Sequence, residues 1–251
     1  MRIGRSLAGA KPAAILLTGI VLLATGCSTS GPRPLSGDLS VNTAKTMLAN
    51  GSPAVALEIC DKRIVNSPRN AELLLCRGDA LTQLGRASEA GAAYTAALKV
   101  DDGSAPARLG LGRLRLATDP AAAEILFVEA LGRDPRNAAI LNNLGIARDL
   151  QGRHADAQTA YGEAIAAAPD LRAPQVNLAL SLAMTGKAGE AVRILRPIAE
   201  RPDASPRERH DLAAALAMEG KGEEAARLLR PELDGAQSDD AIAGFRALPA
   251  R

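Results

Sequence analysis

The feature that most constrains the fold is a glycine that recurs at a nearly constant spacing along the chain. These glycines are Gly51, Gly85, Gly152, Gly186 and Gly220. Their sequence numbers differ by 34, 67, 34 and 34, so the long step leaves room for one further unit that is one residue short. An alanine stands five positions after each glycine. A period of this length predicts a stack of helical hairpins, because one hairpin cannot bury its apolar face alone.

The fourth unit contains the whole repeated pattern. It has Asn143-Leu144-Gly145 in a first helix, Gly152 at a turn, Ala157, Tyr161 and Ala164 in a second helix, and Pro169 at the end. This pattern closely resembles the tetratricopeptide repeat. The resemblance implies an all-α, right-handed superhelical solenoid of about six helix–turn–helix repeats, without strands. The repeats are 37–70, 71–104, 105–137, 138–171, 172–205 and 206–239.

The third repeat departs from the pattern. In the third repeat, Ala117-Thr118-Asp119-Pro120 replaces the glycine turn, with Pro120 suited to the first turn of the next helix. This change is either a neutral deletion or a local change of superhelical twist. After the repeat domain (38–239), residues 240–251 are expected to cap the last apolar face.

The segment 1–26 has the features of a secretory signal. Arg2, Arg5 and Lys11 precede an apolar run, 13–24, which is shorter than the ~20 residues of a membrane-spanning helix. The run ends at Ala24-Thr25-Gly26-Cys27. This resembles a bacterial lipobox, which implies lipidation of Cys27; the alternative is an ordinary signal peptide that contains a cysteine. Ser28 after the cysteine is typical of lipoproteins exported to the outer membrane, with the protein on its periplasmic face.

The segment that starts at Cys27, residues 27–37, is rich in Ser, Gly and Pro and is expected to be a flexible tether. The whole chain has a formal charge of +2, which becomes −1 without Arg2, Arg5 and Lys11. With two Phe, two Tyr and no Trp, the chain offers little for nucleic acid binding. Cys60 and Cys76 form an even pair, which is either a disulfide or two small buried side chains.

The sequence argues against an enzyme. The only histidines are His154 and His210, and neither belongs to a recognisable nucleophile or metal motif. His154 is expected to pack the fourth hairpin, and His210 to lie on the surface. We therefore expect no catalytic site, no metal and no cofactor.

A binding surface is predicted from the position nine before each turn glycine. Asn42, Cys76, Asn143, Asn177 and Asp211 occupy it, with Gly110 at the equivalent place in the short repeat. In tetratricopeptide relatives an asparagine here can hold the backbone of an extended peptide, because an amide both donates and accepts. Asparagine is also simply common in first helices of this type. The breaks at Cys76 and Gly110 favour two half-sites, the stronger in repeats four to six.

The expected floor of this groove is apolar. It comprises Ile146, Leu150, Val176, Leu180, Met184 and Met218. Such a surface usually marks a partner site, although several of these side chains could instead pack between helices.

Three runs carry a closer resemblance, 142–165, 176–195 and 209–229. They look like the TadD lipoproteins of tight-adherence (Flp) pilus systems, over a range from about position 40 to position 230. This implies an outer-membrane lipoprotein that helps to assemble a pilus or related secretion apparatus by supporting its secretin channel. The alternative is a tetratricopeptide scaffold of another envelope machine, in cell-wall synthesis or outer-membrane assembly. The partner would be a protein or an extended peptide segment.

Overall fold

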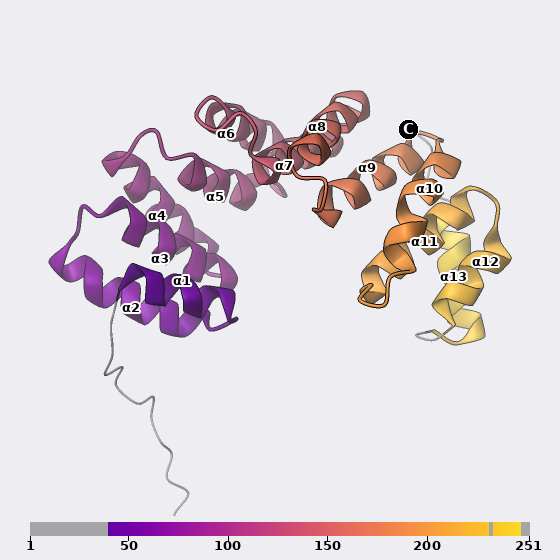
Figure 1. The fold of residues 1–251 in the computed structure, drawn as a ribbon, viewed down its shortest axis with the longest axis horizontal. Coiled ribbons are helices and arrows are strands. Elements are labelled where there is room, and N and C mark those ends of the chain that lie inside the picture. Colours follow the sequence, from indigo (N-terminus) through magenta and orange to yellow (C-terminus); the bar gives the residue numbers. More distant parts are fainter. Residues whose placement is uncertain (1–39, 231–232, 247–251) are drawn as a thin grey trace, which may run out of the picture. The chain divides into compact units, whose positions relative to one another are not determined.

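The computed structural model describes residues 40–230 and 233–246, and these residues form α-helices without any strand (Figure 1). The predicted all-α repeat fold is confirmed. The predicted signal segment (1–26), Cys27 and the predicted tether lie outside the described residues. No helix in the described ranges is both long enough and apolar enough to cross a membrane.

Twelve of the described helices form six consecutive hairpins, and one more follows them (Figure 1). Each hairpin falls within one of the six ranges expected for the repeats. The hairpins are α1 (Val41–Ala49) with α2 (Pro53–Asn66), α3 (Ala71–Gln83) with α4 (Ala87–Val100), α5 (Ala105–Arg115) with α6 (Pro120–Leu131), α7 (Ala138–Leu150) with α8 (His154–Ala167), α9 (Arg172–Met184) with α10 (Ala188–Ala199), and α11 (Pro206–Met218) with α12 (Gly222–Leu229).

The turn inside five of the hairpins depends on glycine. Gly51, Gly85, Gly152, Gly186 and Gly220 have φ values between 69° and 90°. This left-handed conformation costs other residues free energy, whereas glycine adopts it readily. The periodic glycines are therefore the residues that reverse the chain.

The third hairpin turns without glycine. Asp119 accepts a hydrogen bond from the backbone of Ala122 at 2.9 Å, and Pro120 is the first residue of α6. A side-chain cap and a proline thus begin the second helix where the other repeats use a glycine turn.

Aromatic rings of the second helices pack against positions of the first helices that lack a side chain. The Tyr94 ring lies against Gly78 of its own repeat and Gly110 of the next, at places where a Cβ atom would be 2.5 and 2.4 Å from ring carbons. Phe127 and Tyr161 pack on Gly112 and Gly145 of their own repeats in a similar way. Small residues in the first helices therefore set how closely the helices approach.

The apolar core is a series of clusters along the stack of hairpins. The largest joins α9 to α13 and includes Leu195, Leu212, Leu216 and Leu229. The final helix, α13 (Gly235–Arg246), packs on α11 and α12 and buries Ile242 there. Helix α13 begins at Gly235, whereas the cap was expected to start at position 240. Its first residues therefore fall within the range expected for the sixth repeat, 206–239.

Candidate binding site on the first helices

The structure separates the residues that share the position nine before the turn. Asn42 on α1 is exposed, whereas Cys76 on α3 and Asn143 on α7 are buried. Asn177 on α9 and Asp211 on α11 are half-buried. These side chains therefore do not form one continuous row on a surface.

Asn143 was expected to face solvent, and this is wrong. Its side chain is 6% exposed, and its Nδ2 donates to the carbonyl oxygen of Ala139 at 2.7 Å. The side chain is thus buried, and its Nδ2 group is bonded within its own helix. Its neighbour Asn142 occupies the accessible position instead.

Asn142 and Asn177 join two adjacent first helices. Nδ2 of Asn177 donates to Oδ1 of Asn142 at 2.8 Å, from α9 to α7. Asn142 lies ten positions before the turn glycine, one residue outside the register from which the binding surface was predicted. The tandem pair Asn142-Asn143 was the only signal, and it does not say which of the two amides points outward.

A pocket opens beside this amide pair, between α7, α9 and α11. Its lining includes Asn142, Ile146, Val176, Asn177 and Asp211. We call it the groove pocket. It brings together Asn177 and Asp211 of the predicted site, with two of the expected apolar side chains.

The remaining predicted groove residues lie outside this pocket. Leu180 and Met184 are half-buried on α9 and do not line it, and Asn42 belongs to the first repeat. Leu150 is 56% exposed but also lies outside the lining. The pocket is therefore smaller than the expected groove and nearer to the start of α9 and α11.

Asp211 is the most unusual group in the pocket. Its Oδ2 atom is buried and has no hydrogen-bond partner among the described residues. Burial raises the pKa of this carboxyl group, and the nearby charges of Arg207 and His210 act in the opposite direction. Glu208, which also lines the pocket, is already bonded to Ser205 and to Arg172.

Known structures resemble this arrangement of helices. PilW, described as a widely conserved type IV pilus biogenesis factor, matches with a TM-score of 0.72 at 18% identity, over 81% of this chain and 96% of PilW. A tetratricopeptide repeat protein from Parabacteroides merdae matches with a TM-score of 0.63 at 15% identity, over 82% of both chains. The chain has the tetratricopeptide repeat fold.

A third match concerns a protein described by its binding site. YrrB, a tetratricopeptide repeat protein with an unusual peptide-binding site, matches with a TM-score of 0.56 at 18% identity, over 73% of this chain and 97% of YrrB. No protein-family model matches the chain, and no curated protein matches it significantly. At these identities the likeness establishes the fold and nothing more specific.

One polar cluster in this tetratricopeptide fold contains serine, histidine and aspartate. Asp149 on α7 contacts His154 Nδ1 at 2.8 Å, and accepts hydrogen bonds from Ser181 Oγ at 2.8 Å and Tyr161 OH at 3.0 Å. A nucleophile relay places histidine between serine and aspartate. Here aspartate is central and Ser181 is 1% exposed. The cluster therefore ties α7, α8 and α9 together rather than activating a nucleophile.

The pair of cysteines beyond Cys27 lies between the first two tetratricopeptide hairpins. Cys60 on α2 and Cys76 on α3 are both buried, and both are free thiols in this structure. Two effects chiefly raise the pKa of the Cys60 thiol: the larger is a hydrogen bond with Cys76, and the second is burial. The two sulfurs are thus neighbours inside the core. Within the described ranges, no cluster of His, Cys, Asp and Glu is suited to a metal ion.

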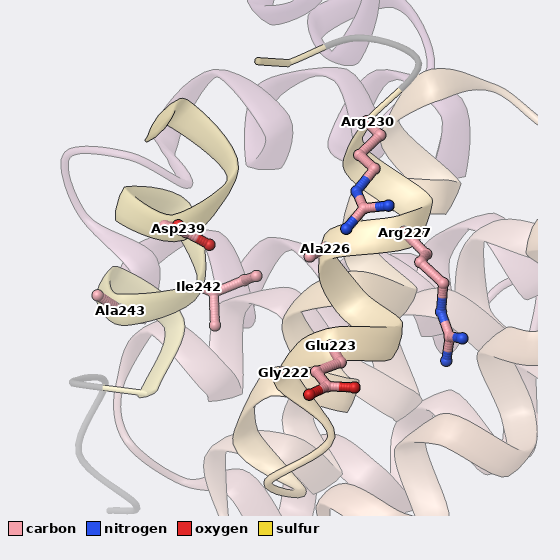
Figure 2. Close-up of a pocket in the computed structure, with 8 residues that line it drawn as sticks. All are labelled: Gly222, Glu223, Ala226, Arg227, Arg230, Asp239, Ile242 and Ala243. Atoms are coloured by element: carbon pink, nitrogen blue, oxygen red, sulfur yellow. The ribbon is translucent and has the colours of Figure 1, made fainter. Parts of the chain in front are cut away.

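Another pocket lies where the last tetratricopeptide hairpin meets α13. Its polar lining comes from Glu223 and Arg227 of α12, from Arg230 just after that helix and from Asp239 of α13. Ile242 points from α13 towards α12 (Figure 2). None of the predicted binding residues lines it. The pocket therefore lies at the interface between the last repeat and the helix that caps it, α13.

Proposed function

We propose that this chain is a scaffold that binds an extended segment of another protein in the groove pocket. The observation that carries the proposal is the pocket itself, in which the Asn142–Asn177 amide pair lies beside Ile146 and Val176. Amides can donate to and accept from a peptide backbone, and apolar side chains can receive those of the peptide. The likeness to tetratricopeptide structures supports protein partners.

We propose further that the partner belongs to a pilus or related secretion apparatus, with the secretin channel as the first candidate. Two observations favour this. The sequence resembles the TadD lipoproteins of tight-adherence pili, and the fold is similar to that of PilW, a pilus biogenesis factor. The alternative is a scaffold for cell-wall synthesis or outer-membrane assembly.

The third part of the proposal concerns location. The apolar run that ends at Thr25-Gly26-Cys27 favours a lipid on Cys27, and Ser28 favours the outer membrane, with the repeats on the periplasmic side. A tether of Ser, Gly and Pro would then let the repeats reach partners near the membrane.

Affinity capture from detergent-solubilised membranes tests the partner. The tagged full chain is expected to capture secretin or pilus assembly proteins, and the Asn142→Ala/Asn177→Ala variant to lose them. Each lost hydrogen bond should weaken binding by about 1 kcal/mol. Asn50→Ala changes an exposed asparagine on another repeat and is the matched control.

The outcomes separate the alternatives. Capture of cell-wall synthesis or outer-membrane assembly proteins instead would contradict the pilus role and support a scaffold role in one of those machines. Undiminished capture by the folded double variant would move the binding site away from the groove pocket. For the anchor, Cys27→Ala should release the protein from membranes, and mass spectrometry should find a lipidated cysteine at the mature N-terminus of the unaltered protein. An unmodified N-terminus at another residue would contradict the anchor.

A further inference from the structure

The groove pocket contains the hydrogen-bonded amide pair Asn142–Asn177. One repeat further along the chain, the two equivalent positions do not carry a pair of amides. Val176 occupies the place of Asn142 one repeat further along the chain, and Asp211 occupies the place of Asn177. The positions that join α7 to α9 through two amides are therefore occupied on α9 and α11 by a valine and an aspartate, and both line the groove pocket. Since the valine side chain has no hydrogen-bond donor, the Asp211 carboxylate has no counterpart there.

The arginines near Asp211 do not supply the missing donor. Arg172 forms ion pairs with Asp203 and Glu208, at 3.3 Å in each case. Arg207 lines the pocket one helical turn before Asp211, but it is exposed, and no ion pair between the two is present among the described residues. A buried carboxylate oxygen without a donor is costly, so a cation that neutralises this carboxylate would be stabilising here.

We propose that Asp211 receives the lysine or arginine side chain of an extended partner segment bound in the groove pocket. This inference rests on the proposed function, and it adds the chemistry of the ligand. The cationic group would pair with the Asp211 carboxylate, which lines the pocket, and the flanking apolar side chains of the segment would cover Ile146 and Val176. Charge complementarity identifies the occupant, because a charge-assisted hydrogen bond compensates a buried carboxylate better than a neutral donor does.

Two properties of the free protein make this arrangement testable. First, Asp211→Asn keeps the shape of the side chain and removes the charge. Second, a carboxylate that serves only the ligand contributes nothing to folding, so the variant should melt at the same temperature or higher. If Asp211 were instead a structural residue, its replacement would lower the melting temperature.

The probe is a phage-displayed library of random heptapeptides, selected on the full chain. Enriched sequences are then synthesised with a fluorescent label and titrated by anisotropy. We expect one position to be enriched in lysine or arginine between apolar residues. Asp211→Asn should weaken binding of such a peptide about tenfold or more, as loss of a buried charge pair does. Asp170→Asn, an exposed acid in the turn before α9, should leave binding unchanged.

A change in the peptide completes the experiment. Replacement of its lysine by norleucine should weaken binding to the unaltered protein to a similar extent and abolish the effect of Asp211→Asn. Peptides without a shared basic position, or with equal affinity for both proteins, would overturn the proposal for Asp211. A lower melting temperature of Asp211→Asn would overturn it as well.

The variant Val176→Glu separates this inference from the proposed function. If Val176→Glu blocks peptide binding and Asp211→Asn does not, the groove pocket binds peptides and only the role of Asp211 fails. If neither substitution matters, or if no peptide is enriched, the groove pocket is not the binding site and both proposals fail.

Discussion

At the scale of single residues, the packing of the repeats depends on positions that have no side chain. A methyl group on Gly145 would lie 2.4 Å from Cε1 of Tyr161. Real Cβ atoms do not approach a ring so closely, and the buried ring has no free space into which it could move. The glycine therefore matters for volume rather than for backbone conformation.

Gly145→Ala should destabilise the protein by about 1–3 kcal/mol, because it overpacks a closed contact. Gly162→Ala is the matched control, since Gly162 is on the adjacent helix α8 and a methyl group there would meet none of the described atoms within 4 Å. That change should stabilise the protein by about 0.5–1 kcal/mol, through the better helix propensity of alanine. Thermal melts followed by circular dichroism measure both, and equal effects of the two substitutions would refute the ring-packing argument.

At the scale of helices, one acidic residue joins the short third repeat to the fourth. Glu124 on α6 accepts hydrogen bonds from Arg148 at 3.0 Å and Gln151 at 2.9 Å, and pairs with Arg153 at 2.7 Å. Burial of the carboxyl group acts to raise its pKa, but these partners outweigh burial and hold the pKa below its usual range. The junction between α6 and α7 thus has a polar cluster, formed by Glu124 and these three partners, beside its apolar core; we call it the Glu124 cluster.

The Glu124 cluster predicts that the stability of the protein depends on pH. Because the pKa of Glu124 is lower in the folded chain than in the unfolded chain, its stabilising effect is complete above the ordinary glutamate pKa of about 4.3. The effect is lost as the pH falls through the lowered folded value. Glu124→Gln should therefore melt below the unaltered protein at pH 7, with a difference that shrinks towards zero in acid. Glu163→Gln, at an exposed position, is the control, and a constant difference across the titration would exclude this linkage.

The helices could be predicted from the sequence far better than the directions of their side chains. Periodic glycines locate the turns of five hairpins, and the ring and alanine positions follow from them, because these residues serve local geometry. The groove is different. Asn142 and Asn143 are adjacent, so they differ by about 100° around the helix, and a motif does not decide which one faces outward. Contacts such as Ser181 with Asp149 join residues 32 positions apart, and no local pattern encodes them.

At the scale of the whole chain, the repeats are linked by contacts between neighbours. First helices pack together in the series α1, α3, α5 and in the series α7, α9, α11, whereas α5 and α7 make at most a marginal contact. The third and fourth repeats are instead connected by the packing of α6 on α7. The groove pocket lies within the second series, so its geometry depends on repeats four to six.

In such an array, a local change should have local effects, and the capping helix offers the test. Ile242 of α13 is 6% exposed and packs in the same cluster as Leu212, Leu216 and Leu229. Ile242→Ala should remove about 2–5 kcal/mol from this cluster. Since stability in a repeat array is transmitted between neighbours, amide hydrogen exchange should accelerate in α11 to α13 and remain unchanged in α1 to α6.

Asp240→Ala, an exposed change on the same helix, separates loss of packing from any effect on the helix itself. It should leave exchange in α11 and α12 unaltered. If Ile242→Ala instead accelerated exchange equally in every repeat, the chain would unfold as one cooperative unit. The groove pocket between α7, α9 and α11 would then owe its shape to the whole array, and removal of the cap would weaken peptide binding as much as it weakens folding.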